Sequence, residues 1–208
     1  MRRYGKCGSM ATVLRAAKRG ICVAGRFVDV LATDDARGAF RAWRRCRREH
    51  APPRLDALAP FALPAAVVPH LLLYRQTDDA ALLCTLAGDE VVNLYGFNPV
   101  GRTILELAPT PEGRRRYEQL TQVIASGLPV WYEGGVLIAG KEHLDLGRLA
   151  LPVQRPDGAP GVLLIGFYLS RGLAGKRLGA VMARPDSPIS FDRALLTWCT
   201  EADLVADD

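Results

Sequence analysis

The residues able to do chemistry are dispersed along this chain of 208 residues. Five cysteines show no CxxC pair, and they are Cys7, Cys22, Cys46, Cys84 and Cys199. An odd, scattered set argues against a disulfide framework or a zinc site and favours a reducing compartment. The sequence also has no GxSxG, P-loop or HExxH motif. We therefore expect no enzymatic activity, no bound metal and a cytoplasmic location.

Two adjacent pairs of residues suggest chemistry at first sight. Asp89 and Glu90 are neighbours on an expected short helix, so their side chains point in different directions, and capping suits them better than acid/base work. No helix start follows Gly134-Gly135, so we expect a bulge or turn there and not a phosphate-binding loop. Neither pair predicts a catalytic site.

The charge of the chain is unevenly placed. Residues 1–50 contain 13 Lys and Arg against 4 Asp and Glu, whereas residues 51–208 contain 14 against 18. The net charge of +5 therefore comes from the N-terminal part, and the remainder is no obvious polyanion binder. We expect residues 1–32 to be a flexible basic extension. No apolar run approaches the roughly 20 residues that a membrane helix needs.

A strongly amphipathic helix is predicted over residues 33–51, because Thr33-Asp34-Asp35 is a good helix start. Its apolar stripe contains Phe40 and Trp43, and arginines cover the rest of its surface. The stripe could dock on its own domain, pair with a second copy or lie on an anionic surface. We expect Phe40 and Trp43 to form a dimer or partner contact. Binding of nucleic acid or an anionic membrane through the arginines is the alternative, which we consider less favoured.

The rest of the chain predicts a domain over residues 52–170 and a loose tail over 171–208. Strands are expected at 70–75, 80–86, 130–138, 146–154 and 161–170. Short helices are expected within 82–107, a longer one at 112–126, and a last short one at 190–201. This order fits an α+β fold, a five-stranded antiparallel sheet with helices on one face, preceded by the amphipathic helix.

The central stretch 82–107, LLCTLAGDEVVNLYGFNPVGRTILEL, has glycines at its corners. With Trp43 upstream, its spacing resembles the PAS domain family, and more narrowly the single-domain branch common in alphaproteobacteria. The matching positions are Pro53-Arg54 through Pro60, Val67 to Leu72, Leu86-Ala87-Gly88, Val91, Gly96, Gly101-Arg102 and Leu105-Glu106-Leu107. The resemblance covers about residues 36–170 and implies a PAS fold in a signalling context. Cys84-Thr85 and Asp89 depart from the family pattern.

Some PAS domains bind a flavin or a haem, and the resemblance implies that either cofactor would leave a recognisable residue in the sequence. A flavin photosensor of this family needs a reactive Cys in the loop after the central helix, which here reads FNPVGRT. A haem sensor puts its axial His on the long helix, and residues 112–126 contain none. His70 and His143 fall at strand edges, where a structural role is the better interpretation. We predict neither cofactor, and an unknown small molecule stays open.

A PAS-type sheet and its helices would enclose an apolar pocket with a few polar groups. We expect its lining to be Val92, Tyr95, Leu105, Tyr117, Trp131, Leu151 and Ile165, with Asn98 and Arg102 as polar ends. The same side chains could instead fill a solid core. The resemblance thus predicts a sensory or adaptor domain in signal transduction. It would bind a small molecule or a signalling protein such as a histidine kinase, with no output domain in the chain.

Overall fold

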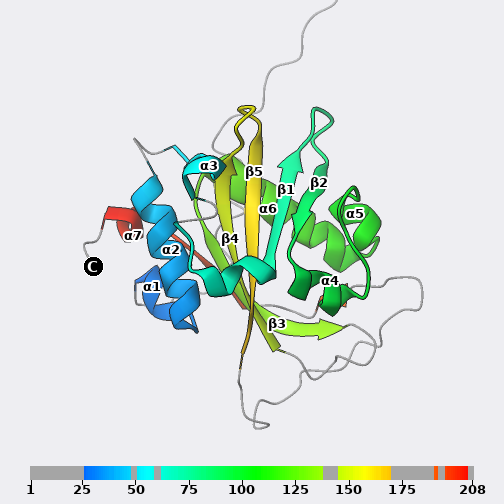
Figure 1. Ribbon diagram of the computed structural model, residues 1–208, viewed down its shortest axis with the longest axis horizontal. Helices are drawn as coiled ribbons and strands as arrows, with labels where there is room; N and C mark the ends of the chain where they lie inside the picture. The colour runs from blue at the N-terminus through cyan, green and yellow to red at the C-terminus, as the bar shows by residue number, and fades with distance from the viewer. Residues whose placement is uncertain are drawn as a thin grey trace, which may run out of the picture.

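The computed structural model describes residues 26–47, 51–58, 62–137, 145–169, 190–191 and 195–205, and His143 lies outside them. Its centre is an antiparallel sheet in the order β2-β1-β5-β4-β3-β6, with β7 also paired to β3 (Figure 1). The five main strands are β1 (Leu71–Gln76), β2 (Leu82–Ala87), β3 (Val130–Leu137), β4 (Asp145–Gln154) and β5 (Pro160–Tyr168). All five expected strands are present, and the α+β class is confirmed.

Helices cover both faces of this sheet, so the expectation of helices on one face is incomplete (Figure 1). One face, here called the α2 face, packs against α1 (Phe27–Val30) and α2 (Asp34–Cys46). The other, the α6 face, packs against α4 (Asp89–Tyr95), α5 (Ile104–Leu107) and α6 (Pro111–Ser126). Strand residues alternate between the faces: Leu149, Leu151 and Val153 join the α2 face, whereas Ala150 joins the α6 face.

Strand β3 has nearly the expected bounds but is more regular than its sequence indicates. Gly134 and Gly135 continue the ladder, pairing in register with Leu146 and Asp145 of β4. The expected bulge is therefore absent. The opposite edge of β3 is covered by β7 (Leu195–Trp198) and by the two-residue β6 (Ser190–Phe191).

The tail departs from its prediction, because the described part of 190–201 contains strands and not a helix. β7 pairs with Val130–Glu133 of β3, and only the short α7 (Glu201–Val205) follows it. An unpaired edge on β3 would leave backbone N–H and C=O groups without partners, and β7 supplies them. The tail also reaches the first helix: the Phe27 backbone N–H donates to Asp203 Oδ1 at 2.8 Å.

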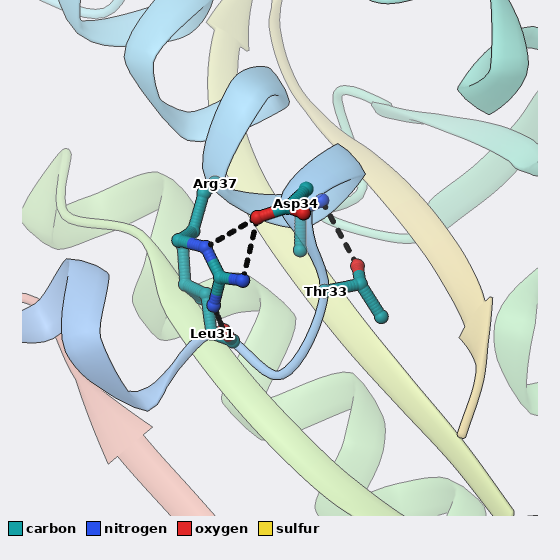
Figure 2. A network of polar contacts seen from close by, with 5 residues as sticks. Leu31, Thr33, Asp34 and Arg37 are labelled. Carbon is teal, nitrogen blue, oxygen red and sulfur yellow. Dashed lines mark hydrogen bonds and ion pairs between the residues drawn. The ribbon is translucent and has the colours of Figure 1, made fainter. Parts of the chain in front are cut away.

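The beginning of α2 is fixed by the side chains expected to start it. The Thr33 hydroxyl accepts from the Ala36 backbone N–H at 3.1 Å. Figure 2 shows Arg37 reaching back to bond Asp34 Oδ1 and the Leu31 carbonyl. Phe27, Val28 and Leu31, before the helix, are buried, so this part of the predicted flexible extension 1–32 belongs to the core.

The apolar stripe of α2 packs on its own sheet. Phe40 and Trp43 are fully buried, and the Trp43 indole N–H donates to the Pro152 carbonyl of β4 at 2.7 Å. Pro152 pairs with Val162 of β5. The prediction that Phe40 and Trp43 contact a second copy is wrong in this structure, because docking inside the chain buries both.

The central stretch folds as expected, with its glycines serving different needs. Gly96 ends α4 and Gly101 turns the following loop, both at positive φ (78° and 86°), where a Cβ is strained. Gly88 has an ordinary extended backbone, but a Cβ there would lie 2.2 Å from the Pro69 carbonyl oxygen. That proline belongs to the 3₁₀ helix η2 (Ala65–His70), which follows α3 (Leu55–Leu58). Gly88 therefore allows close backbone packing.

Candidate functional site

A cavity of about 50 Å³ lies on the α6 face of the sheet. One water needs about 10–15 Å³ by this measure, so a molecule of a few heavy atoms fits. Aliphatic side chains make much of the wall, among them Leu72, Val91, Leu94, Ile104, Leu107 and Leu164. Such a wall favours an apolar ligand part.

Strand β4 places a charged residue at this cavity. Arg148 is paired across the sheet with Tyr132 of β3 and Gly166 of β5, and all three line the space. Only 6% of Arg148 is exposed. A Cβ built on Gly166 would meet one atom, the His70 carbonyl oxygen, at 4.0 Å. The missing side chain at Gly166 therefore leaves space on the cavity side of β5, across the sheet from Arg148.

Helix α6 brings a second arginine to the same place. Arg116 is 5% exposed, whereas Arg114 and Arg115 before it lie in solvent. Its guanidinium carbon lies 3.6 Å from the Tyr132 ring centroid, and that of Arg148 lies 5.8 Å from it. Stacking on an aromatic face is favourable for guanidinium. Two guanidinium groups thus lie close to one buried ring.

The charge state of these groups at neutral pH is set by burial. Burial lowers the pKa of Arg148 to about 10, and the nearby charge of Arg116 adds to this, so Arg148 stays a cation at pH 7. Burial also raises the pKa of Tyr95 to about 12 and that of Tyr74 well above its usual value. Arg148 is therefore charged at neutral pH, whereas Tyr95 and Tyr74 are neutral phenols.

Tyr132 brings a buried hydroxyl to the cavity wall. This hydroxyl makes no hydrogen bond within the described part of the chain. Buried polar atoms are normally paired, and an unpaired one points to a water or ligand. No Asp or Glu is among the described residues that line the cavity.

The fit to larger cofactors is poor. Pockets for drug-sized ligands measure about 300–1,000 Å³, so the cavity suits a group much smaller than a flavin or haem. Among the described residues, no three His, Cys, Asp or Glu side chains gather at ligand spacing for a metal. No described helix has the length and apolar character to cross a bilayer.

Tyr95 alone of the nine predicted pocket residues lines this cavity. Trp131, Leu151 and Ile165 lie on the α2 face, which is the side of the sheet opposite the cavity. Tyr132 and Leu164, one position away, face the cavity instead. A shift of one residue exchanges the faces of a strand, and the prediction was wrong by that one step.

The remaining predicted positions lie around the cavity but not in its wall. Val92 and Leu105 are half-buried beside the lining residues Val91 and Ile104. The Tyr117 hydroxyl donates to the Ala80 carbonyl at 2.9 Å.

The two predicted polar ends are exposed in the loop after α4. Asn98 Oδ1 accepts from the Val100 N–H at 3.0 Å, and Arg102 lies over the Phe97 ring. Both belong to turn structure and not to the cavity.

Cys84, Thr85 and Asp89, the positions that differ from the PAS sequence pattern, are not among the residues that line the cavity. Cys84 is buried in the α6-face core, and burial raises its thiol pKa to about 11. The Thr85 hydroxyl accepts from Arg155 at 3.2 Å, and Asp89 begins α4. These positions therefore serve the framework around the cavity.

Sequence reasoning missed Arg116, Arg148 and Gly166. Two of them left a weak signal: Arg148 is a lone charge in the otherwise apolar run LGRLALPV, and Gly166 interrupts the apolar strand VLLIGFY. A charge or a glycine within a buried strand has positional meaning. Arg116 left none that separates it from the adjacent Arg114 and Arg115.

Comparison with known proteins gives only distant similarity. No family model matches the chain, and no curated protein matches it. A structure of VqmA bound to DPO is 18% identical with a TM-score of 0.38, over 49% of this chain and 53% of that one. A Vibrio cholerae VqmA dimer is 17% identical with a TM-score of 0.34, over 48% and 46%.

A fungal LOV domain photoreceptor is 20% identical with a TM-score of 0.39, and the match covers 61% of this chain and 87% of that one. This chain thus spans about half the length of the VqmA structures that it matches. Similarity at this level carries no argument about ligand or output.

Proposed function

We propose that this chain is a PAS-like sensory domain that binds a small molecule in the α6-face cavity. The observation that carries the proposal is the pairing of open space with buried polar groups. A solid core would fill the position above Gly166, and it would not place two arginines and an unbonded tyrosine hydroxyl around a hollow.

A route from ligand to surface supports a sensing role. The short helix α5 contributes Ile104 and Leu107 to the wall and is held at its start by a capping box of Thr103 and Glu106. A four-residue helix has few internal hydrogen bonds, so its position depends on what it packs against. A bound molecule would change that packing and shift α5 in turn.

The test is native mass spectrometry of the full chain as purified. We expect a bound species of a few heavy atoms that is released on denaturation. Gly166→Val should lose it, because the new side chain occupies the space, whereas Ala159→Val in the β4–β5 turn should keep it. If the wild-type chain carries no such species and no small-molecule panel raises its melting temperature, the function is not ligand sensing.

We also propose that this domain passes its signal to a protein partner. A signalling protein such as a histidine kinase is the partner that a sensory domain would need. Homodimer formation would have to use surfaces other than Phe40 and Trp43, which are buried. The alternative of membrane binding loses its main support, because the apolar stripe of α2 is occupied by the sheet.

A further inference from the structure

We infer that the ligand is a small neutral molecule, with an alkyl body on the aliphatic wall and one oxygen that accepts a hydrogen bond from the Tyr132 hydroxyl. This inference rests on the proposed function and specifies the ligand for the same cavity. It follows from three observations: the buried hydroxyl, the composition of the wall and the size of the space.

The Tyr132 hydroxyl supplies the polar contact. Tyr132 is completely buried and lines the cavity, and its hydroxyl has no hydrogen-bond partner among the described residues. A hydroxyl that leaves water without gaining a partner is unfavourable, and a ligand oxygen would restore the lost hydrogen bond. A phenol donates equally well to a carbonyl oxygen and to an alcohol oxygen, so a ketone and an alcohol both meet this requirement.

The charges around the cavity do not call for an ionic ligand. Arg116 and Arg148 both have interactions within the protein besides their contact with the Tyr132 ring. No Asp or Glu is among the described residues of the wall, and burial raises the pKa values of Tyr74 and Tyr95, so both phenols are neutral at pH 7. An ion would also lose its hydration on entering an aliphatic wall, which a neutral molecule avoids.

The wall and the size of the space restrict the rest of the molecule. Leu72, Val91 and Leu164 offer no hydrogen bond, so a second polar group against them would be unsatisfied. A water at Tyr132 would need about two to four polar partners, and these side chains provide none of them. About 50 Å³ admits roughly four water-sized groups, so acetone, butanone and 1-butanol are suitable probes.

The experiment compares each oxygen-bearing probe with a hydrocarbon of the same shape, on the full-length chain. Butanone is paired with 2-methylbut-1-ene and 1-butanol with pentane, and Kd is measured by NMR titration. Sodium butyrate, at an ionic strength matched with NaCl, is the charged arm. We expect butanone, 1-butanol or both to bind, which distinguishes a ketone from an alcohol, and we expect butyrate to bind more weakly.

Tyr132→Phe isolates the hydrogen bond, because it removes the hydroxyl and keeps the ring. It should weaken binding of the oxygen-bearing probe by about three- to tenfold and leave the hydrocarbon of the same shape unchanged or bound more tightly. Tyr117→Phe is the matched control and should leave every Kd unchanged, since the Tyr117 hydroxyl donates to Ala80 and does not line the cavity. Gly166→Val should abolish binding of all the probes.

The same two tyrosine variants give a readout that needs no ligand. In ligand-free protein, Tyr132→Phe should melt at the wild-type temperature or above, because a buried hydroxyl without a partner is removed. Tyr117→Phe should melt lower, because it loses a hydrogen bond. A Tyr132→Phe chain that melts well below the wild type, or does not fold, would show that the hydroxyl already has a partner and would overturn the inference.

The outcomes separate this inference from the proposed function. Equal loss of affinity for butanone and its hydrocarbon in Tyr132→Phe, or tighter binding of butyrate than of every neutral probe, would overturn the neutral-oxygen inference and leave ligand sensing intact. An unchanged Kd for the ketone and the alcohol in Tyr132→Phe would also overturn it. Absence of any bound species and of any response to the probes would overturn both.

Discussion

The α2 face and the α6 face are built from alternate residues of the same strands, yet large aromatic side chains pack together on the α2 face, whereas the α6 face contains a cavity. On the α2 face, Trp43 is hydrogen-bonded to the sheet, and Trp131 contacts Phe167 with ring centroids 5.8 Å apart. On the α6 face, the central strands present Arg148 beside Gly166. The comparison teaches that a glycine paired with a buried charge leaves space on one face, while alternate residues of the same strands pack against aromatic side chains on the other.

The largest expected effect on stability comes from removing a large side chain from the α2 face. Trp43→Ala removes a fully buried indole and leaves the Pro152 carbonyl without its donor, so we expect a loss of about 3–5 kcal/mol in the free energy of unfolding. Urea denaturation followed by circular dichroism measures it. Trp43→Phe, which keeps an aromatic ring, should cost less. A loss below about 1 kcal/mol for the alanine variant would mean that the packing of Trp43 on the α2 face contributes little to stability.

A matched pair of glycines tests the difference between the faces directly. A Cβ on Gly147 would lie 2.2 Å from Cη2 of the buried Trp131, so Gly147→Ala should destabilise by about 1–3 kcal/mol. Gly166→Ala meets open space and should change stability by no more than about 0.5 kcal/mol or increase it slightly. Equal losses for the two variants, measured in urea, would contradict the proposed difference.

A smaller effect is expected at the rim of the cavity. The Thr103 hydroxyl accepts from the Glu106 N–H at 3.3 Å and donates to its carboxylate at 2.8 Å. Thr103→Ala should cost about 1 kcal/mol. Hydrogen exchange of residues 104–108 should rise while that of α2 does not, and Thr103→Ser should restore the wild-type rate. Exchange that rises equally in α2 would show that α5 is not an independent element.

The smallest effect concerns the reactivity of cysteine thiols. Among the described residues, Cys84 is buried on the α6 face and Cys199 on the α2 face. Burial raises the pKa of Cys84 on the α6 face to about 11 and raises that of Cys199 on the α2 face further above its ordinary value. A raised pKa keeps a thiol protonated and unreactive below it, so roughly one Cys84 side chain in a thousand is thiolate at pH 8.

Among the three described cysteines, iodoacetamide labelling with peptide mapping should therefore modify the half-buried Cys46 first at pH 8. As the pH approaches 11, Cys84 should be labelled before Cys199. All five cysteines should react in denaturant, which is the control. Labelling of Cys199 ahead of Cys84 would reverse the expected order of the two faces.

The sequence was sufficient to predict the strands and the helices on the α6 face, but it did not distinguish the two sides of the sheet. Strand β4 is buried at every position from Leu146 to Val153, because helices cover both faces. A strand buried on both sides has no apolar–polar alternation, so the sequence does not indicate which face Leu151 and Trp131 occupy. In the structure both side chains pack on the face that α2 covers.

Arg148 and the tail were missed for a different reason. A charged residue in a strand is normally exposed, so the lone charge of Arg148 in an apolar run is too weak a signal to predict a buried position. The segment before α7 has apolar residues at spacings compatible with a short helix, and its pairing as β7 depends on the free edge of β3, about 60 residues earlier. Long-range pairing of this kind leaves no local trace.

The late arrival of β7 gives this chain a constraint on folding during synthesis. Strand β3 emerges from the ribosome well before its outer partner, and the hydrogen bond from Phe27 to Asp203 joins residues 176 positions apart. Until the tail is made, β3 presents an open edge to which other nascent chains can pair. The first helices are therefore secured by the last residues, and the two ends of the described chain must be released together when the protein unfolds.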